Sequence, residues 1–195
     1  GLVLLFLLGI FITLYPFISN YQYEHSQEKI IVDYQKVVDN SEEQRLEEER
    51  RAAEEYNKNL LMGNVIQRDP FDPEVIKTIS ENYHSILNLK GDGTLGYIEI
   101  PKIKVYLAMY HGTEEEVLQK GIGHLENSSL PIGGAGTHSV VSAHTGLSDK
   151  KLFSDLSYLI EGDVFYLHVL DEVLAYKVDQ IKIVEPHDTG DLRIS

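Results

Sequence analysis

Cysteine and tryptophan are absent from the 195 residues, and lysine and arginine are scarce, with 17 residues against 31 aspartates and glutamates. Without cysteine, these residues can form no disulfide bond, thiolate metal site or thiol nucleophile. The formal net charge of −14 argues against nucleic acid as a partner, because the phosphates would be repelled. A chain of this length can bury the core of one domain and still carry attached segments.

Charge is also absent from the start of the chain, where residues 2–18 form an apolar run. Such a run can cross most of a bilayer, which requires about 17–25 apolar residues. Tyr21 and Tyr23 fit the aromatic belt that flanks membrane-spanning segments. A secretory signal is the alternative, but the residues after the run offer a poor cleavage site. We therefore expect residues 1–20 to form an uncleaved transmembrane anchor, and the acidic segment that follows is compatible with the outer face of the membrane.

Residues 21–63 are predicted to form two helices. Apolar side chains recur at helical spacing over residues 24–38 and more sparsely over residues 42–61. A capping box that begins at Asn40 or Ser41 is expected to start the second helix. Because apolar heptads are not sustained, a solvated helical stalk is favoured over a coiled coil with a partner.

The rest of the chain changes from a linker pattern to a β pattern. Residues 64–75 contain two Asp-Pro steps, which favour extended or turn geometry and by composition alone indicate a linker. From residue 91 onward, short β patterns are separated by turns and short helices, which predicts a mainly β fold, either a barrel or a sandwich. The expected strands cover residues 97–100, 103–110, 139–143, 164–170 and 173–184, and the expected short helices cover residues 113–121 and 151–159.

His144 is the best-placed candidate for chemistry. It follows the predicted strand 139–143 and precedes Thr145 and Gly146, so it lies in a loop between secondary elements. Histidine titrates near neutral pH and is the commonest proton-transfer group in enzymes. On position alone, a loop histidine without a catalytic task is the simpler interpretation.

Other kinds of site find little support in the sequence. The spacing of His138 and His144 is not a short metal-ligand motif, and no cysteine is available to help. Ser142 is not in a Gly-x-Ser-x-Gly elbow, so a serine hydrolase is not indicated. Residues 133–136 are glycine-rich but lack the lysine of a phosphate loop. We therefore predict no metal and no cofactor.

Several stretches together carry a family resemblance in their order and spacing. They cover residues 96–103, 130–134, 136–147, 151–156, 162–166, 174–179, 184–186 and 191–194, and the longest reads Gly-Thr-His-Ser-Val-Val-Ser-Ala-His-Thr-Gly-Leu. In this combination the chain resembles the class C, pilus-associated sortases of Gram-positive bacteria. The resemblance implies a sortase-type β-barrel with short helices, preceded by the transmembrane helix and the helical N-terminal segment.

The resemblance also implies a chemistry. In such enzymes a cysteine attacks the Thr-Gly bond of a cell-wall sorting signal, and an amine, often a pilin lysine, resolves the thioacyl enzyme. His144 matches the catalytic histidine, which would give a proton to the leaving amine and take one from the incoming amine. The family's catalytic cysteine and arginine follow the stretch at residues 191–194. We therefore expect a C-terminally truncated fragment, with an incomplete barrel and no activity as given.

Class C sortases also carry a lid with an Asp-Pro-aromatic motif, which Asp69-Pro70-Phe71 matches. By resemblance, Phe71 would cover the catalytic cysteine and Asp69 would pair with the catalytic arginine. An aromatic ring can exclude water from a thiolate, and a carboxylate can neutralise a guanidinium. On this basis residues 64–75 form the lid segment, and residues 76–195 form the incomplete catalytic domain.

The leading hypothesis is a membrane-anchored class C sortase with its catalytic domain on the extracellular face. Its partners would be the membrane and pilin proteins that carry a sorting signal and an acceptor lysine. The alternative is a non-catalytic, membrane-tethered surface protein with a degenerate sortase-like domain. A third hypothesis, an unrelated membrane-anchored hydrolase, lacks any nucleophile motif.

Overall fold

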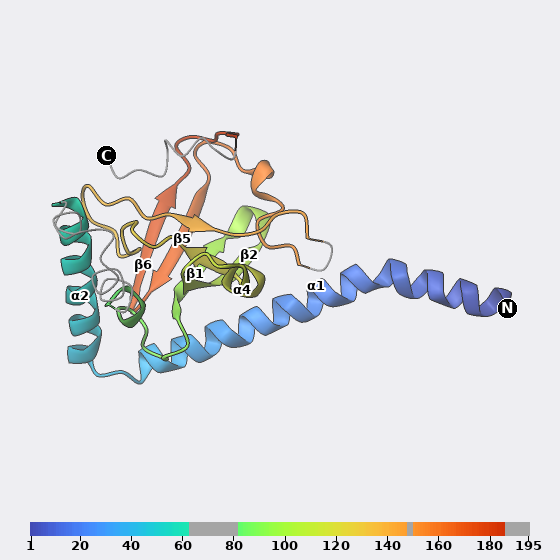
Figure 1. Ribbon diagram of the computed structural model, residues 1–195, viewed down its shortest axis with the longest axis horizontal. Coiled ribbons are helices and arrows are strands. Elements are labelled where there is room, and N and C mark those ends of the chain that lie inside the picture. Colours follow the sequence, from blue (N-terminus) through green and yellow to red (C-terminus); the bar gives the residue numbers. More distant parts are fainter. Residues whose placement is uncertain (63–81, 148–149, 186–195) are drawn as a thin grey trace, which may run out of the picture.

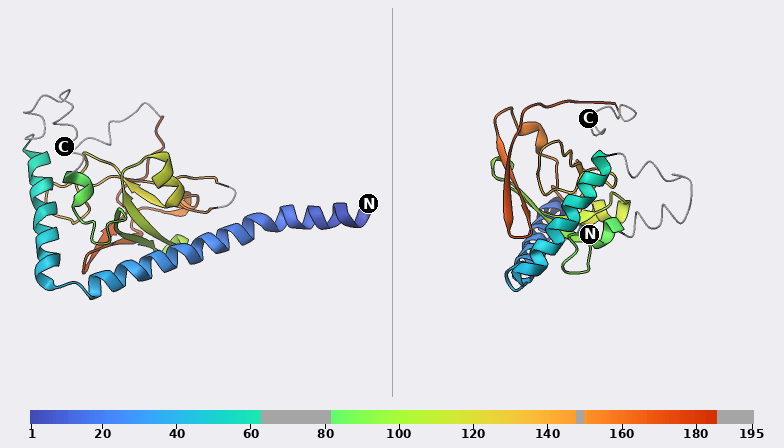
Figure 2. Two further views of the ribbon diagram at one scale, coloured as in Figure 1. Left: turned by 60° about the horizontal axis from the view of Figure 1, so that its bottom comes forward. Right: turned by 90° about the vertical axis from the view of Figure 1, so that its left-hand side faces the viewer.

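The computed structural model describes residues 1–62, 82–147 and 150–185. Two long helices, α1 (Leu2–Asp39) and α2 (Glu43–Leu61), lie beside a curled β-sheet. The N-terminal part of α1 projects beyond the sheet, and its C-terminal part runs along the sheet. After a short turn, α2 leaves at a sharp angle to α1 and stays beside the sheet (Figures 1 and 2).

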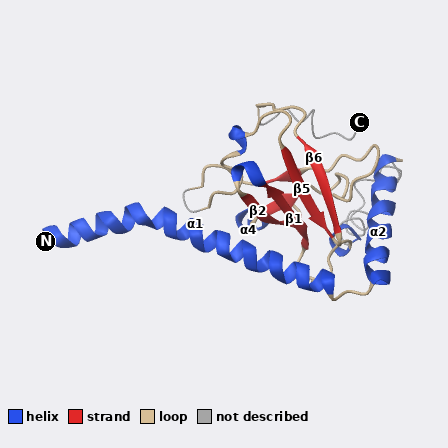
Figure 3. Cartoon of the chain, turned by 180° about the vertical axis from the view of Figure 1, so that it is seen from behind, coloured by secondary structure: helices blue, strands red, loops and turns tan. Residues whose placement is uncertain are grey.

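The sheet has six strands in the order β4-β3-β2-β1-β5-β6. Neighbouring strands are antiparallel except β2 and β3, which are parallel. The sheet curls into a half-barrel with β4 and β6 at its two edges (Figure 3), so the predicted mainly β domain is confirmed. The strands are β1 (Thr94–Ile100), β2 (Val105–His111), β3 (Ile122–His124), β4 (Val141–Ser142), β5 (Val164–Val169) and β6 (Glu172–Lys177), and the short helices are η1 (Pro101–Ile103), α4 (Glu115–Lys120) and η2 (Leu156–Tyr158).

Most predicted strands form, but their lengths differ from the prediction. β6 ends at Lys177 instead of residue 184, and β4 spans two residues instead of five. Of the helix of one to three turns predicted over residues 151–159, only the single 3-10 turn η2 forms. Leu152 has a φ of 37°, in the left-handed region, and this breaks a helical path before it can extend.

The apolar run and the segment after it form one uninterrupted 38-residue helix, although the sequence predicts two pieces. Pro16 lies inside this helix. The N-terminal part of α1 is long and apolar enough to cross a membrane, and none of that stretch is buried in the described structure.

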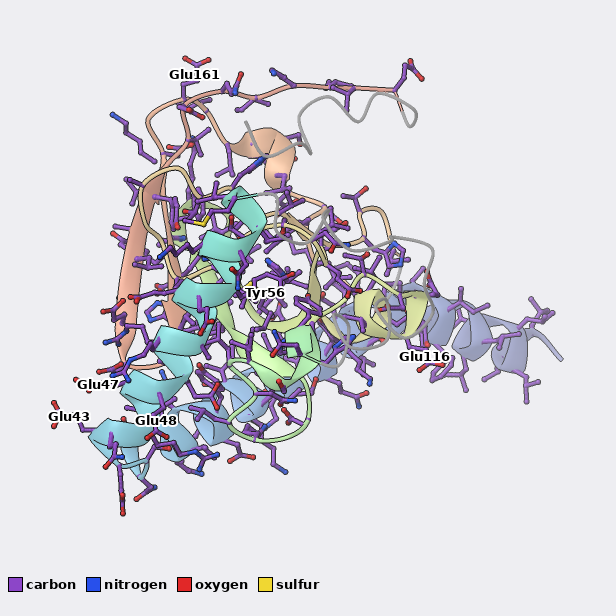
Figure 4. All side chains as sticks on the ribbon, turned by 60° about the vertical axis from the view of Figure 1, so that its left-hand side comes forward. Glu43, Glu47, Glu48, Tyr56, Glu116 and Glu161 are labelled. Atoms are coloured by element: carbon purple, nitrogen blue, oxygen red, sulfur yellow. The ribbon has the colours of Figure 1, made fainter. Side chains whose placement is uncertain are left out.

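The prediction of a solvated stalk over residues 21–63 is wrong, because one face of each helix is buried. Ile31 and Tyr34 of α1 are almost fully buried, and so is Ala53 of α2. On α2, Tyr56 points toward the sheet, whereas Glu43, Glu47 and Glu48 are exposed (Figure 4). The apolar stripe was visible in the sequence, but the surface that covers it was not.

The predicted capping box at the start of α2 is also wrong. The helix begins after Glu42, and no side chain caps it. Asn40 and Ser41 instead donate side-chain hydrogen bonds backward, to the carbonyl oxygens of Lys36 (2.6 Å) and Val37 (2.7 Å). These two side chains therefore provide donors for carbonyls in the last turn of α1, where the carbonyl of Lys36 also accepts from the backbone N–H of Asn40 (3.1 Å).

Buried amide side chains fasten both helices to the half-barrel. Gln27 of α1 donates to the carbonyl of Lys120 (2.8 Å) and accepts from the backbone N–H of Ala108 (3.0 Å). Asn57 of α2 donates to the carbonyl of Leu130 (3.0 Å) and accepts from its N–H (2.7 Å). Each amide thus replaces a missing backbone partner, as buried polar groups require.

Tyr34 makes the third attachment of this kind. Its hydroxyl donates to the carbonyl of Leu95 in β1 (3.1 Å) and accepts from the N–H of Leu170 in the β5–β6 turn (2.9 Å). Burial raises the pKa of Tyr34 to about 12, so the hydroxyl stays protonated and can donate at neutral pH. One α1 side chain therefore joins the helix to two parts of the sheet.

We predict that Tyr34→Phe lowers the free energy of unfolding by about 1–3 kcal/mol, because it removes both hydrogen bonds while keeping the ring. Denaturant titration of the chain in detergent measures this loss. Tyr158→Phe is the matched control, since Tyr158 is 68% exposed and should change stability little. Equal stabilities for the two variants would contradict this account of the helix attachment.

Candidate active site around His144

His144 lies two residues beyond the edge strand β4, in the loop that leads toward η2. Its side chain is 30% exposed, so the imidazole is partly sheltered but can still meet a solute. The backbone around it is anchored, because Phe153 N–H donates to the His144 carbonyl (3.2 Å) and Gly146 N–H donates to Ser154 Oγ (3.0 Å). Gly146 has a φ of 72°, which favours glycine at the turn after the histidine.

The same loop reaches the anchor helix. The backbone N–H of Lys151 donates to Asn20 Oδ1 of α1 (2.9 Å). Lys150 places its ammonium group 5.6 Å from the centre of the Tyr23 ring, also on α1. The segment after His144 is therefore fixed to the part of α1 that immediately follows its apolar stretch.

The acidic group nearest to His144 in the described residues comes from α4. Glu115 Oε2 lies 3.3 Å from His144 Nε2, although the orientation in the structure does not form a hydrogen bond. Gln119, one turn later, donates to Glu115 Oε1 (2.6 Å). The hydrogen bond from Gln119 holds the pKa of Glu115 below its ordinary value, and the nearby His144 acts in the same direction.

The strand that delivers His144 is held by two buried serines. Ser128 Oγ accepts from the N–H of Val140 (3.1 Å), and Ser129 Oγ accepts from the N–H of His138 (3.0 Å). The backbone of Ser129 also donates to the carbonyl of His138 (2.8 Å). These side chains supply acceptors that a neighbouring strand would supply in a regular sheet. The backbone that leads to His144 is therefore held in place although β4 is short.

A fully buried histidine, His124, contacts both serines. His124 Nδ1 lies 2.9 Å from Tyr83 Oη, and its Nε2 lies 2.9 Å from the Ser129 carbonyl oxygen. Tyr83 Oη also accepts from the N–H of Gly112 (3.0 Å). Burial lowers the pKa of His124 to about 4, so its ring is neutral at physiological pH.

A groove of about 500 Å³ opens between residues 130–139 and the β5–β6 hairpin. Its walls include the apolar side chains of Val141, Phe165 and Leu174, together with His138. No group of three or more histidine, aspartate or glutamate side chains is placed to hold a metal ion among the described residues. Polar side chains, among them Thr137 and Ser139, also line the groove.

The lid residues predicted from the sequence, Asp69 and Phe71, lie outside the described residues, as does the whole segment 64–75. Of the predicted site residues, the structure therefore describes His144 alone. Sequence reasoning missed Glu115. Its i,i+4 pairing with Gln119 was a visible helical signal, but nothing in the sequence indicated that His144 lies beside it.

We predict that the chain loses stability as the pH falls from 7 to 4. In the folded state His124 binds a proton only near pH 4, whereas an unfolded histidine does so near pH 6.5, so unfolding takes up a proton between these values. The contribution of His124 is about 3 kcal/mol at pH 4. Burial also lowers the pKa of His111, which adds to the loss in the same direction.

Urea titrations at several pH values measure this dependence. Between pH 7 and pH 4, the unfolding free energy of His124→Gln should decrease by about 3 kcal/mol less than that of the wild type. His25→Gln is the control, since His25 is exposed on α1 and should keep the full slope. An unchanged slope in His124→Gln would show that the buried ring is not the source.

Known proteins resemble this chain in sequence and in structure. A family model described as the sortase domain matches residues 98–194. Sortase C1 from Streptococcus agalactiae is 42% identical with a TM-score of 0.75, and the match covers 84% of this chain and 82% of that one. The Clostridium perfringens sortase C solved with the C-terminal cell wall sorting motif is also 42% identical, with a TM-score of 0.70 and coverage of 86% and 83%.

A third solved structure, sortase C of Streptococcus pneumoniae, is 41% identical with a TM-score of 0.68, and the match covers 86% of this chain and 82% of that one. Sortase D of Bacillus subtilis (strain 168) is 32% identical over 95 residues, which are 49% of this chain. The match spans 45% of that relative, less than half its length. With the half-barrel and the family match together, the chain belongs to the sortase family, and its structure is that of a class C sortase.

Proposed function

We propose that this chain is the membrane-anchored part of a cysteine transpeptidase that cleaves a cell-wall sorting signal and joins pilin subunits through isopeptide bonds. The observation that carries the proposal is the position of His144. It matches the family's catalytic histidine in sequence, and it stands on an anchored loop at the edge of a half-barrel shared with class C sortases.

The proposed reaction has two steps. A thiolate attacks the carbonyl carbon of the threonine in the Thr-Gly bond, and the glycine nitrogen leaves with a proton from the His144 imidazolium, which produces a thioester and a free amine. A lysine amine of a second pilin then attacks the thioester, and neutral His144 accepts the proton that this amine loses. The products are an isopeptide bond, the regenerated thiolate and protonated His144.

The thiol must come from outside these residues, because the 195 residues contain no cysteine. The proposal therefore requires that the coding sequence past Ser195 encodes a cysteine and, after it, an arginine. Reading that sequence is a direct test. An in-frame stop codon would instead favour the non-catalytic, membrane-tethered surface protein, which the missing cysteine already allows.

Membrane anchoring on the extracellular side is part of the proposal. It is supported by the exposed apolar stretch of α1, which a bilayer would cover. The second half of α1 packs against the half-barrel, so the domain would lie close to the membrane surface. A sorting signal held in the same membrane would then be near the site.

We also propose that residues 64–75 form a lid, with Phe71 over the catalytic thiol and Asp69 paired with the catalytic arginine. The support is the Asp-Pro-Phe motif of the sequence. A ring over a thiolate limits access by water and by other solutes, which would protect the enzyme while no substrate is bound.

We predict that His144→Ala in the complete gene product reduces cleavage of a sorting-signal peptide by about 10²–10⁴-fold, because proton transfer to the leaving amine is lost. Chromatography with mass detection measures the cleaved peptide. His25→Ala is the matched control and should retain activity, since His25 lies exposed on α1. The 195-residue chain alone should release no product. Wild-type rates in His144→Ala would overturn the proposed role.

The lid predicts a second result in the complete product. Phe71→Ala should raise the rate of thiol alkylation by a small reagent roughly tenfold, because the ring no longer shields the sulfur. Glu74→Ala, in the same segment, should leave the rate unchanged. Equal rates for wild type and Phe71→Ala would remove Phe71 from the lid.

A further inference from the structure

We propose that Glu115 is a positioning residue for His144, whose carboxylate keeps a proton on Nε2 and leaves Nδ1 as the nitrogen that exchanges protons with substrate. The consequence for catalysis rests on the proposed function, whereas the positioning itself does not. The starting observation is that His144 Nε2 is buried, forms no hydrogen bond with the described residues, and faces Glu115 Oε2 at 3.3 Å.

The carboxylate of Glu115 is oriented by its own helix. Gln119 holds Oε1 at 2.6 Å, which leaves Oε2 to face His144. A modest rotation of the imidazole would convert the contact at 3.3 Å into a hydrogen bond. A carboxylate beside one ring nitrogen fixes the tautomer and the ring orientation, because it accepts from that nitrogen only when the nitrogen carries the proton.

The position of α4 is in turn set from two sides. At its C-terminal end, the carbonyl oxygen of Lys120 accepts from Tyr23 Oη (3.0 Å) and Gln27 Nε2 (2.8 Å), both on α1. From the His144 loop, Lys150 Nζ donates to the carbonyl oxygen of Gln119 (2.7 Å). The helix that presents Glu115 is therefore clamped between α1 and the segment that follows His144.

The expected energies separate positioning from a structural role. The Glu115 side chain is 69% exposed, so solvent screens its interaction with His144 and the pair contributes little to stability. Removing the carboxylate should thus leave the fold intact. Without a fixed tautomer, a smaller fraction of His144 rings carries the proton on Nε2 and presents an unprotonated Nδ1 to the substrate. We expect this loss to slow the proposed reaction about tenfold.

Ring-nitrogen NMR of histidine-labelled chain in detergent tests the positioning directly, because protonated and unprotonated ring nitrogens give well-separated signals. His144→Gln assigns the signals, and the measurement is made where the ring is neutral. We expect predominantly the Nε2–H form in the wild type and a mixture of tautomers in Glu115→Ala. Glu115→Gln retains an acceptor oxygen and should largely restore the wild-type spectrum.

Glu116→Gln is the matched control, because Glu116 is the next residue on the exposed surface of α4 (Figure 4). It should leave the His144 signals and the thermal transition unchanged. Unchanged His144 signals in a folded Glu115→Ala chain would overturn the inference, and so would an equal effect of Glu116→Gln.

Kinetics of the complete gene product separate this inference from the proposed function. If His144→Ala abolishes cleavage and Glu115→Ala lowers kcat about tenfold with little change in KM, both stand. If Glu115→Ala alters the tautomer while His144→Ala cleaves at the wild-type rate, the proposed function fails and the positioning stands. If Glu115→Ala alters neither the His144 ring-nitrogen signals nor the cleavage rate, the positioning inference fails and the proposed function is unaffected.

Discussion

The attachment of α1 to the half-barrel by buried polar side chains is the interaction on which the other parts of the structure depend. Tyr34 joins β1 to the β5–β6 turn, and Gln27 joins β2 to the end of α4. Apolar packing of residues such as Ile31 supplies contact area, but it would tolerate sliding or rotation of the helix. Directional hydrogen bonds to specific backbone groups fix one register, because a displaced helix would leave buried donors and acceptors without partners.

The site follows from this attachment through a short series of contacts. Gln27 and Tyr23 fix the end of α4, α4 presents Glu115, and Glu115 lies beside His144. A second support comes from the interior, where His124 and two serines define the path of the chain into β4. The histidine is therefore carried by a loop, but both its backbone and its neighbours belong to a packed structure. In the proposed reaction, a general acid at His144 would meet two different amines in turn, and such a group would need a defined position.

Much of the fold was predictable from local pattern, and the missing parts have physical causes. Alternating or continuous apolar runs predicted β1, β2 and the β5–β6 hairpin, and the apolar N-terminus predicted the start of α1. β3 escaped notice because three residues are too few to show a period. Its middle residue must be glycine because a Cβ there would collide with the Gly112 carbonyl oxygen, a contact set by the fold.

The site was less predictable than the fold. His144 could be selected because a family motif surrounds it, whereas position alone left it ambiguous. Glu115 lies far away in sequence, and the contact exists only because the parallel pairing of β2 with β3 brings α4 to the end of β4. The stalk was mispredicted for a related reason: a stripe on a helix shows that something covers it, but a long-range partner such as Leu95 cannot be read from the stripe.

Helix α1 is unbroken from its apolar start to Tyr34, so it would set the distance between a membrane around its apolar part and the β domain. With α1 crossing the bilayer as proposed, no joint separates the membrane from the domain, and 14 helical residues between Asn20 and Tyr34 span only about 21 Å. The bond from Lys151 to Asn20 places the loop after His144 at the foot of this span. If α1 is anchored as proposed, the loop after His144 would therefore lie close to the lipid surface, where a substrate anchored in the same membrane could reach it.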